Sequence, residues 1–111
     1  MMEIDVANNI KAVELLKVEL MQAITDLFGD ISAEVDSENH IRLANDSASI
    51  MIITKLLCKR LGIADEAVNA AMCRKLKGGI DDNHPLEKRF GDLSRLLSEI
   101  REDNSYNEYE Y

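Results

Sequence analysis

Residues 48–57 read Ala48-Ser-Ile-Met-Ile-Ile-Thr-Lys-Leu-Leu57, a stretch that is apolar on nearly every side of a helix. A helix without a polar face is typical of the interior of a helical bundle. The neighbouring residues extend this helix over about 38–61, and Gly62 ends it. With one proline, few aromatic residues and no alternating apolar pattern among its 111 residues, the sequence predicts an all-α fold.

Three further helices are predicted, over about residues 4–28, 65–77 and 85–101. The first carries an apolar stripe in steps of three and four residues: Val6, Ile10, Val13, Leu16, Leu20, Ile24 and Leu27. Leu15, Val18 and Met21 lie outside that stripe, and a helix with two apolar sides usually buries the second against its own bundle or another subunit. We therefore expect a four-helix bundle that assembles as a homodimer or a pair of dimers.

Glycine and proline predict the ends of the helices, and the amino-acid composition predicts the limits of the domain. Gly78-Gly79 is predicted to end the third helix, and Pro85 suits the first position of the fourth. A chain of this length builds one modest core, so residues 1–101 are expected to form a single domain. Residues 102–111 hold all three tyrosines and four acids but no base, which predicts a disordered acidic tail.

The charge distribution excludes some classes of function. The net charge of −8 excludes a generally basic nucleic-acid binder, and no stretch is long enough for a membrane span. Residues 1–54 carry −7, residues 55–101 carry +3 and the last ten carry −4. This asymmetry indicates either complementary charge between packed helices or an acidic metal-binding wall facing a basic phosphate-binding wall. Two isolated cysteines and an acidic N-terminus without an apolar segment favour a reduced, cytoplasmic setting.

The residue types that carry chemistry are few. A zinc site would need His40, His84, Cys58 and Cys73 to converge from four places without any local ligand pair, so helix caps and buried thiols explain them better. What remains is carboxylates on helices, such as Glu19 beside apolar positions and Asp46 directly before the buried stretch. Two packed helices that point carboxylates into one gap can bind a hard divalent ion. Composition and spacing by themselves reach no further than this.

Several segments together resemble the MazG-like proteins of the all-α nucleoside triphosphate pyrophosphohydrolase superfamily. The similarity is greatest where an apolar helix ends in Arg60-Leu-Gly-Ile63 and a short helix runs from Asp65-Glu-Ala-Val68 to Lys75-Leu76. Downstream, Leu86-Glu-Lys-Arg-Phe-Gly-Asp-Leu-Ser-Arg-Leu-Leu97 is similar to the end of a small, divergent MazG-like subgroup. The resemblance covers most of residues 6–101.

Family members carry EExxE on the first helix and ExxD on the second, and four of these carboxylates hold magnesium. The EExxE motif corresponds here to Val18-Glu19-Leu-Met-Gln22, where Glu19 is the only acid. The second falls on Asp46-Ser-Ala-Ser49 when counted back without gaps from Arg60, and it keeps only Asp46. A competing register, Arg42-Leu-Ala-Asn45, retains neither acid, and we prefer the first because it needs no insertion in a buried helix.

The resemblance implies magnesium (or manganese) and a nucleoside triphosphate substrate cleaved between the α and β phosphorus atoms. Glu19 and Asp46 would be the remaining metal ligands, with Gln22 and Ser49 as neutral replacements. Lys75 and Lys77 lie in the region that corresponds to the family's phosphate-contacting end. Because two of four carboxylates are replaced, we expect weak or lost hydrolase activity. The alternative is a non-catalytic nucleotide-binding or protein-interaction module.

Overall fold

A computed structural model describes residues 2–32 and 37–109, with side chains described over residues 6–32 and 38–103. The regular elements in those residues are all helices: α1 (Met2–Ile31), α2 (Ser37–Arg60), α3 (Asp65–Asp81), α4 (Pro85–Phe90) and α5 (Asp92–Tyr109). The all-α prediction is therefore confirmed. The chain divides into two compact units, Met1–Ala64 and Asp65–Tyr111, and the single domain over residues 1–101 stays a prediction. Within the described residues, no helix has the length and apolar character needed to cross a membrane.

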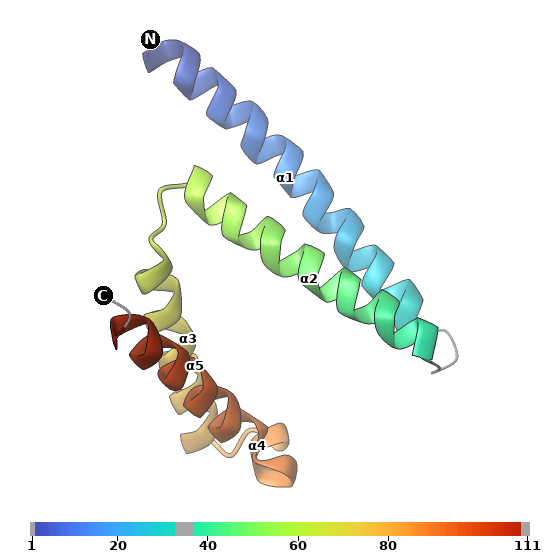
Figure 1. Ribbon diagram of the computed structural model, residues 1–111, viewed down its shortest axis with the longest axis vertical. Coiled ribbons are helices and arrows are strands. Elements are labelled where there is room, and N and C mark those ends of the chain that lie inside the picture. Colours follow the sequence, from blue (N-terminus) through green and yellow to red (C-terminus); the bar gives the residue numbers. More distant parts are fainter. Residues whose placement is uncertain (1, 33–36, 110–111) are drawn as a thin grey trace. The chain divides into compact units, whose positions relative to one another are not determined.

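The first unit is a hairpin in which α1 and α2 run antiparallel, side by side (Figure 1). The amide nitrogen Nδ2 of Asn9, near the start of α1, donates to the carbonyl oxygen of Arg60 at the end of α2 over 2.8 Å. Between these ends the helices bury a seam that advances in steps of three and four residues. Its apolar members are Val13, Leu16, Leu20, Ala23, Leu27, Leu43, Ile50, Ile53 and Leu57, all buried or half-buried.

The hairpin covers only one side of each helix, so the apolar middle of α2 is not enclosed within this unit. Met51, Ile52 and Leu56 remain largely exposed, although their stretch predicted the most buried helix of the bundle. The first helix is also longer than predicted. It passes the expected end at residue 28 and continues to Ile31, where the N–H of Ser32 bonds to the carbonyl of Gly29 over 3.2 Å.

In the second unit α3 packs against α5, with Leu97 as its most deeply buried apolar residue. The prediction that Gly78-Gly79 ends the third helix is wrong, because α3 continues through both glycines to Asp81. At Gly79 an added Cβ would collide with the side chain of Leu93 on α5. Glycine is therefore used here for close approach of two helices rather than as a breaker.

The predicted fourth helix is two helices, α4 and α5, so the chain has five described helices instead of four. They separate at Gly91, whose φ of 70° lies in the left-handed region that favours glycine. The carboxylate of Glu87 accepts hydrogen bonds from the backbone N–H (2.9 Å) and the hydroxyl of Ser94, and so caps the start of α5. This contact holds the two helices at a fixed break.

The C-terminal helix extends further than the sequence predicts. Residues 102–109 belong to α5, whereas we expected a disordered tail from residue 102 onward. The segment contains no glycine or proline after Gly91, so nothing in it stops the helix. Residues 110 and 111 of the expected tail lie outside the described residues.

Candidate functional site

A polar cavity lies on one face of the α1–α2 hairpin, beside the apolar seam. The structure brings the four positions singled out by the family resemblance to this one place. Its volume is about 250 Å³, and it is lined by Glu19, Gln22, Ala23, Asp26, Asp46, Ser49 and Ile53. The preferred register therefore places Glu19 and Gln22 opposite Asp46 and Ser49, and their role as metal ligands stays a prediction.

Helical spacing explains this arrangement. Glu19 and Gln22 are three residues apart on α1, and Asp46 and Ser49 are three apart on α2, so each pair shares one side of its helix. The seam residues Ala23 on α1 and Ile53 on α2 also line the cavity.

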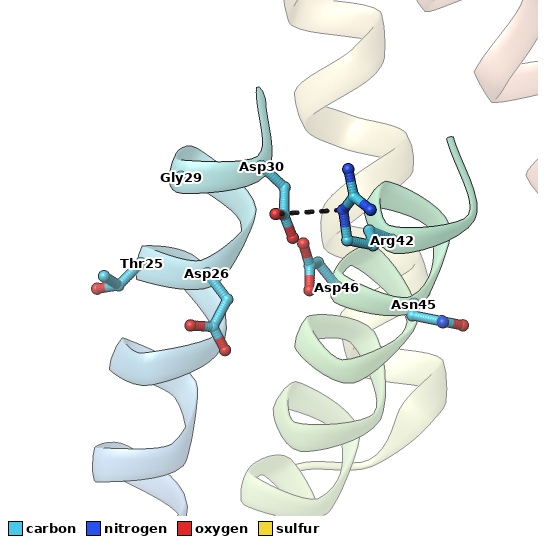
Figure 2. Close-up of a pocket in the computed structure, with 7 residues that line it drawn as sticks. All are labelled: Thr25, Asp26, Gly29, Asp30, Arg42, Asn45 and Asp46. Carbon is cyan, nitrogen blue, oxygen red and sulfur yellow. Dashed lines mark ion pairs between the residues drawn. The ribbon is translucent and has the colours of Figure 1, made fainter. Parts of the chain in front are cut away.

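A second cavity of about 490 Å³ adjoins the first toward the α1–α2 connection. It is lined by Thr25, Asp26, Gly29, Asp30, Arg42, Asn45 and Asp46. Figure 2 shows Asp26 and Asp30 from α1 and Asp46 and Arg42 from α2 gathered in the space between the helices, whereas Thr25 and Asn45 point away from it. Asp26 and Asp46 line both cavities, which therefore form one continuous acidic surface.

Asp46 is electrostatically the most perturbed carboxyl group of this surface. Its pKa is raised from 3.8 to about 6, chiefly by a hydrogen bond shared with Asp30, then by burial and by the negative charges of Asp30 and Asp26. The positive charge of Arg42 lowers the pKa in opposition. The Oδ2 atom of Asp46 is shielded from solvent and accepts no hydrogen bond from the described residues.

Arg42 is the cation of this group. Its Nε lies 3.7 Å from Oδ1 of Asp30, and its Nη2 donates to Oδ1 of Asn39 over 3.3 Å. Asn39 is completely buried at the start of the seam. The guanidinium is therefore held between a carboxylate of α1 and an amide of its own helix.

The sequence pointed to Glu19 and Asp46 but missed Asp26, Asp30 and Arg42. A signal for Asp30 was present, because Asp30 follows Leu27 by three residues and continues the stepping of the α1 seam. Asp46 holds the corresponding kind of position on α2, between Leu43 and Ile50. Carboxylates at two positions of an otherwise apolar seam mark the end of the hairpin where polar groups gather.

Lys75 and Lys77, the predicted phosphate contacts, are exposed on α3. They belong to the second compact unit, whereas the carboxylates belong to the first. Their role toward phosphate stays a prediction.

The side chains around the cavities do not fit a magnesium ion in the way that four carboxylates would. In the described part of the chain, no three His, Cys, Asp or Glu side chains are arranged to hold a metal ion. The amide nitrogen of Gln22 donates to Oδ1 of Asp26 over 2.8 Å, so a hydrogen-bond donor occupies part of the acidic surface. Magnesium needs several oxygen ligands in near-octahedral geometry, and the described carboxylates of this surface are not arranged to bring three of them to one ion.

In the described residues, the regular elements are all helices, and acidic and amide side chains of two packed helices surround one cavity. The family model for the MazG-like family matches residues 6–93, which include α1 to α4 almost entirely. The chain belongs to the MazG-like family, as its resemblance to those proteins predicts. Neither a curated protein nor a solved structure matches the chain significantly. Membership implies a fold like that of the nucleoside triphosphate pyrophosphohydrolases.

Proposed function

We propose that this MazG-like protein has lost most or all metal-dependent nucleoside triphosphate pyrophosphohydrolase activity and serves as a helical interaction module. The observation that carries the proposal is the replacement of two ligand positions in the smaller cavity by Gln22 and Ser49. Gln22 turns its amide toward Asp26, so it supplies a donor where a metal site needs an acceptor. A nucleoside triphosphate carries a charge of about −4, which a weakened metal site neutralises poorly.

A residual hydrolase is the second candidate, and one observation favours it. Glu19 and Asp46 line the same cavity, and Asp26 adds a third carboxylate there. In that case magnesium or manganese would be the cofactor, and Glu19 and Asp46 would be its main protein ligands. A metal ion so placed would supply charge neutralisation for the triphosphate.

Release of pyrophosphate separates the two candidates. A panel of ribo- and deoxynucleoside triphosphates is incubated with the protein and with magnesium or manganese. The matched variants are Glu19→Ala, inside the cavity, and Glu14→Ala, an exposed acid of α1 that pairs with Lys17. We expect no metal-dependent turnover from any of the three proteins. Turnover that Glu19→Ala abolishes and Glu14→Ala leaves intact would establish the hydrolase instead.

The interaction role rests on apolar side chains that the hairpin leaves uncovered. Met21, Ile24, Phe28 and Ile31 follow steps of three and four residues on α1 and form an exposed apolar stripe, with Met21 69% and Phe28 64% exposed. Ile24 belongs to it because it is 37% exposed, although the sequence predicts it in the buried stripe. Monomeric soluble proteins seldom expose contiguous apolar surfaces of this kind. We propose that a second copy of the chain covers this stripe, which gives a homodimer or a pair of dimers.

The assembly is tested by the mass in solution at micromolar concentration, measured by light scattering. Phe28→Glu places a charge on the stripe and should shift the mass toward one chain. Asn8→Glu adds the same charge to an exposed position of α1 that lies off the stripe, and it should leave the mass unchanged. A wild-type mass equal to one chain would refute the assembly.

A further inference from the structure

The carboxylates near the α1–α2 connection occupy positions that are otherwise apolar. Asp30 continues the seam of α1 after Leu27, and Asp46 lies in the seam of α2 between Leu43 and Ile50. Figure 2 shows the two carboxylates facing each other between the helices. Like charges repel more strongly where water is partly excluded, so a nearby positive charge stabilises this end of the hairpin.

Arg42 is placed to supply that charge. Its Nε lies 3.7 Å from Oδ1 of Asp30, and its Nη2 bonds to the buried Asn39 over 3.3 Å. The side chain of Arg42 is half-exposed, at 47%, and it lines the larger cavity. Arginine does not lose its proton in proteins, and therefore the charge is permanent.

We propose that Arg42 is the resident cation of the acidic cavity and excludes a divalent metal ion from it. The cavity lining holds three carboxylates, Asp26, Asp30 and Asp46, and Arg42 is the one basic residue among the lining residues. A divalent ion in the same space would have to approach a fixed positive charge that is already paired with Asp30. Arg42 lines the larger cavity, which shares Asp26 and Asp46 with the smaller cavity that holds the family's ligand positions, so its charge acts on that metal site through the two shared acids. The inference rests on the proposed loss of metal-dependent hydrolysis and adds the residue that enforces it.

Two features separate this role from that of an ordinary surface ion pair. Arg42 contacts one residue from each helix, and both contacts lie at seam positions instead of on the outer surface. Arg42 is also the first residue of the Arg42-Leu-Ala-Asn45 segment, the competing register. It therefore lies four residues, about one helical turn, before Asp46, the acid of the preferred register. Removal of the side chain leaves the three carboxylates without a basic partner in the cavity lining.

The test is binding of Mn²⁺ alone, without nucleotide, followed by the electron paramagnetic resonance signal of the free ion. Arg42→Gln should bind Mn²⁺ at least tenfold more tightly than the wild-type protein. Arg42→Lys keeps the positive charge and should behave like the wild type. Lys55→Gln removes an equal charge from an exposed position of α2 outside both cavities, and it should gain nothing. In the Arg42→Gln background, Asp30→Asn should remove the gain.

Helical content by circular dichroism confirms that each variant is folded. The proposal is overturned if the wild type binds Mn²⁺ as tightly as Arg42→Gln, or if Lys55→Gln gains as much affinity as Arg42→Gln. These outcomes are independent of the pyrophosphate assay, because no nucleotide is present. Hydrolysis by the wild type would refute the proposed function, whereas the Mn²⁺ titration alone decides the role of Arg42.

Discussion

The two adjacent glycines of α3 should respond in opposite ways to the same substitution. Both lie within the helix that runs from Asp65 to Asp81. A Cβ added at Gly78 would meet no atom within 4 Å, whereas a Cβ added at Gly79 would collide with Cδ2 of Leu93 on α5. Comparing Gly78→Ala with Gly79→Ala therefore separates the effect of helix propensity on stability from the effect of side-chain packing.

The magnitudes follow from these two terms. Alanine in place of glycine inside a helix gains about 1 kcal/mol, and both positions share this gain. At Gly79 it is opposed by overpacking of about 1–3 kcal/mol, because Leu93 must change rotamer or the two helices must separate. We expect Gly78→Ala to raise the free energy of unfolding by up to about 1 kcal/mol and Gly79→Ala to lower it by about 0–2 kcal/mol.

Urea unfolding of the full chain, followed by far-ultraviolet circular dichroism, measures this difference. With an m value of about 1–3 kcal/mol/M, a difference of about 2 kcal/mol separates the two midpoints by about 1 M. Leu93→Ala supplies the control, because in that background the collision is absent and the two glycine substitutions should act alike. The reasoning is refuted if Gly79→Ala is as stable as Gly78→Ala while Leu93 is present.

Three further predictions concern charge and backbone conformation. Hydrogen bonds from Ser94 lower the pKa of Glu87 from 4.5, so Glu87→Gln should lower the thermal unfolding temperature near neutral pH. The difference between variant and wild type should vanish as the pH falls through the lowered pKa of Glu87. Glu99→Gln, also a loss of one carboxylate but on α5, is the control. The pKa of Asp46 is raised to about 6, so the stability that its protonated form contributes is complete below pH 3.8 and is lost as the pH rises through 6. Over that range the unfolding temperature of the wild type should fall relative to that of Asp46→Asn. Unfolding temperatures that change with pH in parallel would contradict this prediction. Gly91→Ala should cost about 1–2 kcal/mol because of its positive φ, whereas Gly29→Ala, in open space within α1, should gain about 1 kcal/mol, both by urea unfolding.

The helical class and most helices could be predicted from periodicity, but their ends could not. Gly78-Gly79 and Gly91 both predict the end of a helix from the local sequence. In the structure α3 continues through Gly78-Gly79, whereas α4 ends before Gly91. The difference depends on Leu93, a residue of another helix that comes close to Gly79 in the fold. Such a tertiary contact leaves no trace in the local sequence.

The candidate site could also be predicted only in part, because some of its residues meet only through tertiary contacts. Glu19 and Asp46 were found through motif positions, and the structure brings both to one cavity. Arg42 falls in the competing register, which the sequence disfavours because the preferred register needs no insertion in a buried helix. Its contact with Asp30 links segments on either side of the α1–α2 connection, and pairing of that kind requires the fold.

The place where the seam breaks its own pattern is also the place where the cavities lie. From Val13 to Leu27 on α1 the seam is apolar, and then Asp30 follows; on α2 the buried Asn39 and Asp46 stand on either side of Leu43. Apolar residues at these positions would hold the hairpin together better, since a polar residue in a helical seam lowers stability while it specifies register. Local rules of this kind are usually broken at functional sites. The polar end of the hairpin is therefore the part of the first unit whose residues the requirements of folding alone do not explain.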